Sequence, residues 1–284
     1  MRLVSYAHQG RSGFGAIVGD TVLELSTPAF PTLRDALAGE GVAGIRKRAD
    51  AFGPSDGTRF PLSSIRYLQP ITAPDKILCV GLNYHLHAKE AGMAIPKTPS
   101  IFVRFPGAQV GHLEPTVRPK ASDAFDYEAE LAVIIGKAAR HVTLDTAMQY
   151  VAGYSCFAEN SLRDRQKHAT QATPGKNFQS SGAFGPWLIT ADEVPDPKKI
   201  DVIGRLNGQE MQRDSAANMI FTVEEMIVYM STFIELLPGD VIVTGTPAGV
   251  GFTKKPPLYL KPGDVFEVEC TGVGTLSNPV VDEK

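Results

Sequence analysis

The clearest periodic pattern of apolar positions lies between Phe221 and Leu237, where apolar residues recur at helical spacing. Thr222 and Glu225 have the spacing of a capping box at its start, and Pro238 with Gly239 ends it. The pattern predicts a helix over Phe221–Leu237 that packs one face on the core. Its apolar positions are Val223, Met226, Ile227, Met230, Phe233, Ile234 and Leu237.

The first part of the chain predicts a small module of strands and helices. Strand patterns lie at Arg2–Tyr6 and Gly15–Leu25, and Gly19-Asp20 within the second predicts a hairpin turn. Thr32–Ala38 and Ile45–Phe52 have helical patterns. Together these elements predict a small α+β domain at the N-terminus.

Two clusters of turn-forming residues follow this module, and the second predicts the domain boundary. The first is Gly53–Gly57, which contains glycine, proline, serine and aspartate. The second is Pro70–Pro74, which precedes a buried strand predicted at Lys76–Val80. The expected domains are residues 1–70 and residues 71–284.

From Lys76 onward, short apolar runs alternate with glycine and proline, which predicts strands joined by turns. A second helix is predicted at Leu144–Tyr150. The tripeptide Pro-Gly-Asp precedes a strand pattern twice, at Pro238–Val243 and at Pro262–Glu267, which is typical of turns in an antiparallel β-rich core. The predicted fold class is therefore α+β, mostly β.

Charge and cysteine content limit the classes of function. The 284 residues have a formal charge of −3 and a pI near 6.1, which gives no indication of a surface for nucleic acid or anionic membranes. Cys79, Cys156 and Cys270 are widely spaced and odd in number, which indicates neither a disulfide framework nor a zinc site. Neither an apolar leader nor a run of membrane-spanning length is present. We expect a cytoplasmic protein that binds neither nucleic acid nor membrane.

The stretch Asp126–Gly136 combines a strand pattern with paired acidic residues. On a strand, Glu128 and Glu130 project from the same side, roughly 7 Å apart along the backbone. Two like charges beside an apolar strand resist burial unless a positive charge lies between them, and Mg²⁺, Mn²⁺ and Ca²⁺ take carboxylate oxygens as ligands. The alternative is an amphipathic strand with a solvated acidic face.

A second candidate cluster follows the strand predicted at Lys76–Val80. If the segment after Gly81 is helical, His87 and Glu90 lie one turn apart. A carboxylate bound to one imidazole nitrogen makes the other nitrogen a better base, which is the minimum needed to activate water. Gly92 would suit a mobile lid. The alternative is a His/Glu pair on an exposed loop.

Four further polar residues have side chains suited to a substrate site. Arg163 and Gln166 are spaced to share one side of a helical turn, where they can bind a carboxylate or oxyanion. Glu159 can add a third carboxylate to a cation site. Lys176 lies on a predicted turn, where it can polarise a carbonyl or stabilise an enolate. The alternatives are an exposed polar helix and a solvated lysine.

The glycine-rich segment Thr244–Gly251 permits close approach of the backbone to a ligand. It lacks the Lys-Ser/Thr pair of a P-loop and the glycine spacing of a dinucleotide fold, so a tight turn between strands is the alternative. Neither a Gly-x-Ser-x-Gly nor a His-Glu-x-x-His motif occurs in the chain. The sequence therefore supports neither a serine hydrolase nor a zinc protease.

Taken in order, these motifs resemble those of the fumarylacetoacetate hydrolase family, over roughly residues 70–282. The residues that carry the resemblance are Gly81–Tyr84, His87, Glu90, Asp126–Glu128, Glu130-Leu131, Gly153-Tyr154, Ser161, Arg163-Asp164, Gln166, Gly175-Lys176, Gly185–Trp187, Gly239-Asp240, Thr244–Pro247 and Gly249–Gly251. The resemblance implies a catalytic domain of the mixed β-roll type behind a small α+β N-terminal domain, usually in a homodimer.

The resemblance also implies a metal site. Glu128, Glu130 and Glu159 would hold Mg²⁺ or Mn²⁺, with Ca²⁺ as a further option. The third metal position of the family is commonly Asp, and Glu159 is longer by one methylene, about 1.5 Å. This length predicts a displaced, bidentate, weaker or water-mediated contact, and predicts that Glu159→Asp tightens metal binding. Arg165 replaces a frequent aromatic residue and adds positive charge.

The same resemblance implies catalytic and binding roles. His87 and Glu90 would activate water from a lid that orders over the substrate, and Lys176 would stabilise an enolate together with the metal. Contacts with the substrate, a small 2-oxo or β-diketo acid, would come from Arg163, Gln166 and Thr246.

The implied reaction is metal-dependent hydrolysis of a carbon–carbon bond in a β-diketo acid, such as an acylpyruvate or a fumarylacetoacetate-like compound. The same site could instead decarboxylate oxaloacetate. It could also decarboxylate and isomerise an intermediate of aromatic compound catabolism, of the 2-hydroxyhepta-2,4-diene-1,7-dioate type. A third alternative is a protein that binds a small dicarboxylate without catalysis.

Overall fold

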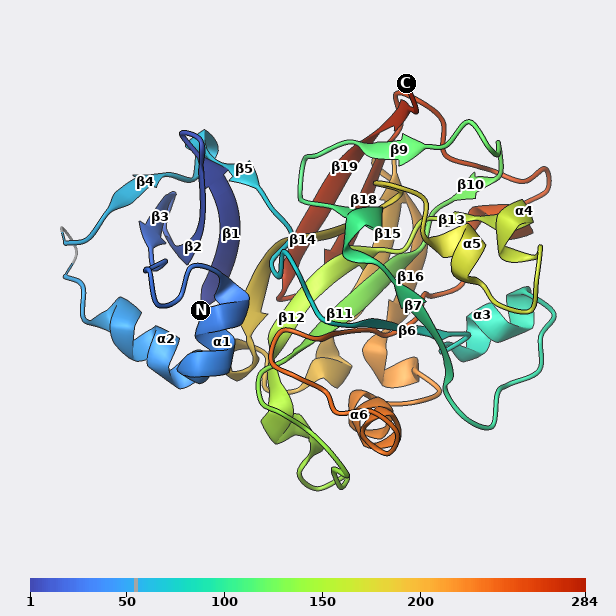
Figure 1. Cartoon of the computed structure of the whole chain (residues 1–284). Coiled ribbons are helices and arrows are strands. Elements are labelled where there is room, and N and C mark those ends of the chain that lie inside the picture. Colours follow the sequence, from blue (N-terminus) through green and yellow to red (C-terminus); the bar gives the residue numbers. More distant parts are fainter. Residues whose placement is uncertain (54–55) are drawn as a thin grey trace.

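A long mixed β-sheet forms the centre of the computed structural model, which describes residues 1–53 and 56–284 (Figure 1). In spatial order, the main path of this sheet is β4 (Arg59–Pro61), β3 (Thr21–Glu24), β2 (Arg11–Val18), β1 (Arg2–His8), β14 (Gly182–Thr190), β12 (Val151–Ala158), β11 (Ala129–Ile135), β17 (Val241–Val243), β6 (Ile77–Gly81) and β7 (Ser100–Arg104). Two short strands, β5 (Arg66–Tyr67) and β8 (Gln109–Val110), pair with β1 and β14.

A second sheet packs against the first. Its order is β16 (Gln209–Ser215), β15 (Asp201–Leu206), β18 (Val265–Cys270), β19 (Gly274–Asp282) and β9 (Thr116–Arg118). Most strand pairs in both sheets are antiparallel, whereas β6 with β17, β8 with β14 and β9 with β19 are parallel. The predicted α+β fold with mostly β-structure and mixed sheets is confirmed.

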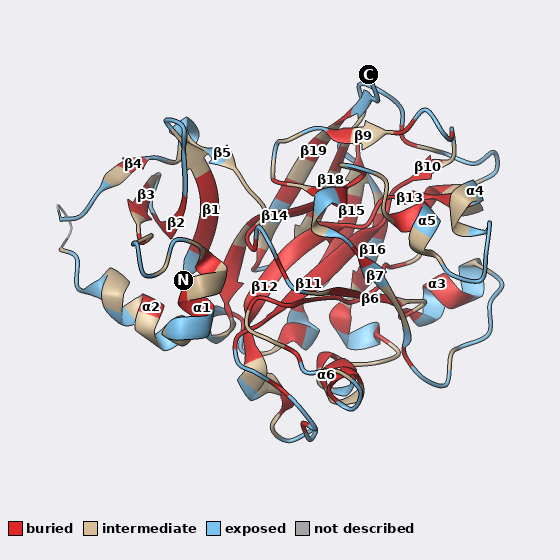
Figure 2. Ribbon diagram, in the orientation of Figure 1, coloured by how far each residue is buried: buried red, intermediate tan, exposed pale blue. Residues whose placement is uncertain are grey.

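Strand β11 is buried along its whole length because both of its faces are covered (Figure 2). Leu131 and Val133 pack into one apolar cluster, and Ala132 and Ile134 pack into another. Side chains alternate along a strand, so this strand separates the two clusters. The side chain of Glu130 is on the same face of the strand as that of Ala132, and it therefore lies at the end of the second cluster.

The N-terminal module continues the main sheet. Its strand β1 pairs antiparallel with β14, with Arg2 opposite Ile189 and Leu3 opposite Leu188. The predicted hairpin at Gly19-Asp20 is present, since it joins β2 to β3. The two predicted helices are α1 (Leu33–Gly39) and α2 (Gly41–Asp50).

The boundary expected near residue 70 stays a prediction. The pairing of β1 with β14 places strands from both sides of that boundary in one sheet. The earlier turn predicted at Gly53–Gly57 includes Pro54 and Ser55, which lie outside the described residues.

The strand predicted at Asp126–Gly136 is interrupted at Tyr127 and Glu128. Its first residues form β10 (Phe125–Asp126), which pairs with β13 (Ser161–Leu162) in a separate small sheet. The remainder is β11, which pairs with β12 and β17. The backbone changes partners at Glu128, so this residue lies at a break in the strand.

Two helix predictions need correction. The predicted helix Phe221–Leu237 is α6, Val223–Ser231, with the expected capping box but an earlier end. The carbonyl of Ser231 accepts the N–H of His141 and its hydroxyl accepts that of Val142, so a neighbouring segment binds the last turn. At Leu144–Tyr150 only Ala147–Tyr150 is helical, as a 3₁₀ turn whose short hydrogen bonds do not extend into an α-helix.

The other helices, α3 (His85–Glu90), α4 (Arg163–Gln166) and α5 (Thr173–Lys176), are short. In Figure 1 they lie on the right-hand side, opposite the N-terminal module. No helix in the described part of the chain is both long and apolar enough to cross a membrane.

Candidate active site

Three carboxylates converge beside the end of β11, and we call Glu128, Glu130 and Glu159 the carboxylate triad. One oxygen of each lies within 4.8 Å of the others, and all three side chains are buried. The geometry follows from strand pairing. Ala129 is opposite Ala158, and the next residue, Glu159, donates its N–H to the carbonyl of Glu128 at 2.9 Å.

Two basic side chains bind the triad. The ammonium of Lys176 lies 2.5 Å from Oε2 of Glu128 and 2.8 Å from Oε2 of Glu159. Arg163 places Nη1 2.7 Å from Oε1 of Glu128, while its Nε donates to Asp126 at 2.7 Å. Lys176 thus bridges two members of the carboxylate triad.

The members of the triad have different electrostatic environments. Burial would raise the pKa of Glu128, but the charges of Arg163 and Lys176 outweigh burial and hold that pKa below its usual range. Burial and the charges of Glu159 and Glu128 raise the pKa of Glu130 well above its usual range. Lys176 and Arg163 therefore compensate the negative charge of Glu128 more than that of Glu130.

The donor set fits a hard divalent cation. All candidate ligand atoms are carboxylate oxygens, the type that Mg²⁺, Mn²⁺ and Ca²⁺ prefer. Oε1 of Glu159 is buried without a protein partner, and Glu130 accepts the N–H of Gly245 at 2.6 Å. A buried carboxylate oxygen without a partner is costly, and a cation would stabilise it.

A cavity of about 370 Å³ opens beside the triad. Of the nine predicted site residues, eight line this cavity and Glu90 does not. The eight are His87, Glu128, Glu130, Glu159, Arg163, Gln166, Lys176 and Thr246. Residues from 87 to 246 in the chain thus meet around one volume suited to a small molecule.

The three predicted substrate contacts differ in the polar groups that they leave free. Nη2 of Arg163 is buried without a partner, so it can donate to a ligand. Gln166 uses Oε1 to accept a hydrogen bond from Nη1 of Arg163 at 3.1 Å, which leaves its amide N–H groups. Thr246 donates its hydroxyl hydrogen to the carbonyl of Ala129 at 2.9 Å. That hydroxyl therefore has no hydrogen left for a substrate carboxylate.

His87 and Glu90 lie on α3, as the predicted spacing requires, but they do not form a hydrogen bond. Nδ1 of His87 is 3.7 Å from Oε2 of Glu90. Glu90 instead accepts the N–H of Gly249 at 2.9 Å and the hydroxyl of Thr253 at 2.7 Å. Burial would raise the pKa of Glu90, but its contact with His87 and these two hydrogen bonds lower it. Glu90 thus ties α3 to the loop after β17.

Asp126 also belongs to the site, although no role was predicted for it. Its carboxylate accepts Nε of Arg163, as well as the N–H groups of Gly251 and Phe252 at 2.7 and 3.0 Å. The ring of Phe252 lies 4.5 Å from the guanidinium of Arg163. The sequence shows an acidic residue two positions before Glu128, but no local pattern shows its partners, which lie 37 residues away at Arg163 and more than 100 residues away at Gly251 and Phe252.

Arg165, expected to add positive charge beside the site, is directed elsewhere. Its Nη2 donates to the carbonyl of Ala121, and its Nε lies 3.6 Å from Asp164. Lys167, two residues later, lines the cavity in its place, with its ammonium 5.9 Å from the ring of Phe252.

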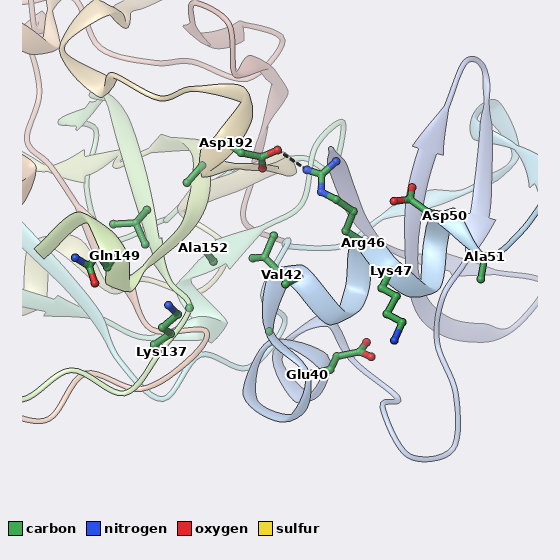
Figure 3. A pocket seen from close by; sticks show the side chains of 15 residues that line it. Glu40, Val42, Arg46, Lys47, Asp50, Ala51, Lys137, Gln149, Ala152 and Asp192 are labelled. Carbon is green, nitrogen blue, oxygen red and sulfur yellow. Dashed lines mark hydrogen bonds and ion pairs between the residues drawn. The ribbon is translucent and has the colours of Figure 1, made fainter. Parts of the chain in front are cut away.

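A larger cavity lies away from the triad. It has a volume of about 940 Å³ and separates α2 from the loop that contains Lys137 and Gln149 (Figure 3). None of the predicted site residues lines it, and its Arg46 pairs with Asp192 at 2.5 Å. Size alone therefore does not identify the candidate site, whereas the convergence of titratable groups does.

Comparisons with known proteins place this chain among characterised relatives. A family model described as "Fumarylacetoacetate (FAA) hydrolase C-terminal" matches residues 76–281. The human protein named oxaloacetate tautomerase FAHD2A, mitochondrial, is 40% identical over 291 residues, which cover 99% of this chain and 92% of that protein.

Two solved structures are similar to this chain along almost the whole length of both proteins. The 2-hydroxyhepta-2,4-diene-1,7-dioate isomerase from Mycobacterium marinum has a TM-score of 0.79 and 30% identity, over 100% of this chain and 99% of the other. The maleylpyruvate hydrolase from Sphingobium sp. SYK-6, in complex with manganese(II) and pyruvate, has a TM-score of 0.83 and 27% identity, over 100% of each chain. The named relatives are enzymes of three reaction types.

Proposed function

This chain belongs to the fumarylacetoacetate hydrolase family, and from that premise we propose that it is a divalent-metal-dependent enzyme that interconverts the keto and enol forms of a small 2-oxo dicarboxylic acid, oxaloacetate in the first instance. The observation that carries the proposal is the group of Lys176, Arg163 and the carboxylate triad around one small cavity. The 40% identity with a protein named oxaloacetate tautomerase supports oxaloacetate as the substrate.

The chemical demand of this reaction is to stabilise an enolate. Removal of a proton from the carbon next to the 2-oxo group leaves negative charge on the 2-oxo oxygen. The pKa of Lys176 is raised because, although burial lowers it, Glu128 and Glu159 outweigh burial, so its ammonium stays charged beside that oxygen. Nη2 of Arg163 is free to bind the adjacent carboxylate.

His87 is the residue that moves the proton. It is buried at the cavity wall, and its Nδ1 faces Glu90 at 3.7 Å, which leaves Nε2 as the atom to exchange a proton with carbon 3 of the substrate. The nearby carboxylate stabilises the imidazolium that forms.

A divalent cation held by the triad would act as a Lewis acid that withdraws electron density from the bound 2-oxo acid. Mg²⁺ and Mn²⁺ are both compatible with a three-carboxylate donor set. The manganese(II) and pyruvate present in the maleylpyruvate hydrolase structure support this choice of metal and of substrate class.

Hydrolysis of an acylpyruvate is the second candidate, and the position of Glu90 beside His87 favours it. Hydrolysis needs a base strong enough to deprotonate water, and hydrogen bonds formed with substrate present often shorten contacts that are long without it. We rank it second because tautomerisation requires only the enolate-binding group and one proton carrier.

Location and assembly are part of the same proposal. We expect the homodimer that the family resemblance implies, and a cytoplasmic location. The human relative is named as mitochondrial, so its location differs from the one expected here.

The test is to follow the ultraviolet absorbance of the oxaloacetate enol after mixing with catalytic amounts of the protein. The metal-loaded protein should accelerate enol decay and the chelated protein should not. Lys176→Met should slow the reaction by at least about 10²-fold, the scale of losing one charge-stabilising group. Lys89→Met, the same change at an exposed lysine of α3, is the matched control. Absence of any acceleration with Mg²⁺ or Mn²⁺ overturns the tautomerase assignment.

A further inference from the structure

A third buried cation lies behind the carboxylate triad. Arg104, at the end of β7, is 2% exposed. Its Nη1 donates to the carbonyl of Asn160 at 3.0 Å and its Nη2 donates to the hydroxyl of Ser181 at 3.3 Å. Unlike Arg163 and Lys176, it has no carboxylate oxygen within 4.0 Å among the described residues.

The surroundings of Arg104 are polar on the side of the triad. Nε of Arg104, Oε1 of Glu159 and both amide atoms of Asn160 and Gln109 are buried without protein partners. Gly182 provides the room for this group. A Cβ at Gly182 would lie 2.3 Å from Oε1 of Gln109 and 2.6 Å from Nη2 of Arg104. Buried polar atoms of this kind ordinarily bind ordered water.

Burial lowers the pKa of Arg104, and among the carboxylates of the triad Glu159 opposes that shift most strongly, ahead of Glu128 and Glu130. The two oxygens of Glu159 are thus treated differently. Oε2 binds Lys176, while Oε1 has neither lysine nor arginine in contact.

We propose that Arg104 is a buried counter-charge to Glu159 that stabilises the triad when no metal is bound and, by the same charge, limits the affinity of the triad for a divalent cation. The inference rests on the proposed metal site and deepens it. Without a cation, three carboxylates repel one another, and a fixed positive charge reduces this cost. When a cation enters, the same charge repels it. Arg104 therefore stabilises the metal-free protein and also favours release of the metal.

A purely structural role is the competing explanation. Arg104 packs over the ring of Phe157 at 5.9 Å and holds the carbonyl of Asn160, so its removal would lower stability in any case. The two explanations differ in the sign of the effect on metal affinity. Loss of packing leaves metal affinity unchanged or weakens it, whereas loss of a counter-charge tightens it.

The experiment is calorimetric titration of Mn²⁺ into the full-length wild type, Arg104→Gln and Arg104→Lys, with melting temperatures measured with and without Mn²⁺. Arg104→Gln should bind Mn²⁺ about tenfold more tightly, melt lower than the wild type without metal, and gain more from added Mn²⁺. Arg104→Lys, which keeps the charge, should bind Mn²⁺ within about threefold of the wild type. If Arg104→Gln does not fold, Arg104→Met, which fills more of the apolar volume, takes its place.

The matched control is Arg48→Met. Arg48 is a partly buried arginine that pairs with Glu40 in the N-terminal module, so its loss should lower the melting temperature without changing Mn²⁺ affinity. Unchanged or weaker Mn²⁺ binding by the uncharged Arg104 variants overturns the proposal. A wild-type protein that binds no Mn²⁺ overturns the metal site itself, a result distinct from failure of the role of Arg104.

Discussion

At the scale of single residues, the site is a set of buried charges that compensate one another in pairs. Lys176 joins Glu128 to Glu159, and Arg163 joins Glu128 to Asp126. Removal of one member of a buried ion pair typically costs about 3–5 kcal/mol, because its partner stays buried and uncompensated. Variants at these positions therefore change stability as well as function, and each activity measurement needs a measurement of folding beside it.

Glu159→Asp tests whether the longer carboxylate is adapted to this triad. The sequence alone predicts tighter metal binding by the shorter residue, whereas the geometry of the triad leads us to expect weaker binding. Glu159 already reaches the other two carboxylates and binds Lys176 at 2.8 Å, and Asp would withdraw the oxygen by about 1.5 Å. We expect Mn²⁺ affinity to fall about tenfold, which is about 1.4 kcal/mol, in a calorimetric titration.

Tighter binding by Glu159→Asp would contradict this account. Opposite ligands of Mg²⁺ are about 4.2 Å apart, since each bond is about 2.1 Å. The triad oxygens lie within 4.8 Å of one another. A gain in affinity would mean that the wild-type triad is too wide and that the shorter residue corrects it.

At the scale of elements, the site depends on how α3 is held. His87 lines the cavity, while Glu90 of the same helix binds Gly249 and Thr253 in the loop after β17. A helix of six residues has few internal hydrogen bonds, so these contacts fix its position. If the segment around His87 is the lid that the sequence predicts, the two hydrogen bonds of Glu90 to Gly249 and Thr253 are the contacts that hold it closed.

Glu90→Gln should separate tautomerisation from hydrolysis. An amide at this position can keep one hydrogen bond to the loop but does not stabilise an imidazolium. We expect acylpyruvate hydrolysis, where it occurs, to fall by roughly 10² or more, the usual scale for losing general-base catalysis. Oxaloacetate tautomerisation, which needs a weaker base, should fall less than about tenfold.

Thr253→Val is the control for the role of Glu90 in holding α3, because it removes one hydrogen bond to Glu90 and keeps the carboxylate. The measurement is parallel kinetics of both substrates for both variants. If Glu90→Gln slows the two reactions equally, Glu90 acts by closing α3 and does not adjust the basicity of His87.

The sequence predicted elements well where local pattern and tertiary contacts agree. The hairpin at Gly19-Asp20 and the start of α6 follow from turn and capping residues alone. The end of α6 at Ser231 could not be predicted, because its last carbonyl is bound by residues some 90 positions away. The strand break at Glu128 likewise depends on pairing with β13, which no local pattern reports.

The site residues divide in the same way. Glu128 and Glu130 were indicated by their spacing in a predicted strand and His87 by its spacing to Glu90, while the family resemblance implied the roles of Glu159 and Lys176. The charge-bearing partners Asp126 and Arg104 were not assigned, since each acts through side chains distant in sequence. A buried arginine inside a strand has no sequence signature that separates it from a solvated one.

At the scale of the whole molecule, the N-terminal module and the rest of the chain share a sheet and an apolar cluster. Leu3, Phe14 and Leu33 belong to the same cluster as Phe184 and Leu188 of β14. Removal of the module would expose this cluster and leave the edge of β14 without its antiparallel partner. The module therefore contributes to the stability of the strands that carry the triad.

In the full-length protein, Leu3→Ala should lower the free energy of unfolding by about 2–5 kcal/mol, the usual range for a buried leucine.

We expect a chain of residues 71–284 alone to aggregate or to lose cooperative unfolding, measured by circular dichroism and light scattering. A monodisperse 71–284 chain with a cooperative melting transition that Mn²⁺ raises would show that the expected boundary near residue 70 separates independently folding domains.

We expect Glu128, Glu130 and Glu159 to hold one divalent cation together. A crystal structure of the protein soaked with Mn²⁺ and oxalate, with anomalous data collected at the manganese absorption edge, would locate that cation. We expect one strong anomalous peak within about 2.0–2.6 Å of a carboxylate oxygen from each of the three residues, with oxalate completing the coordination beside Lys176. A peak that lacks any one of the three glutamates, or manganese bound only elsewhere on the protein, would contradict it.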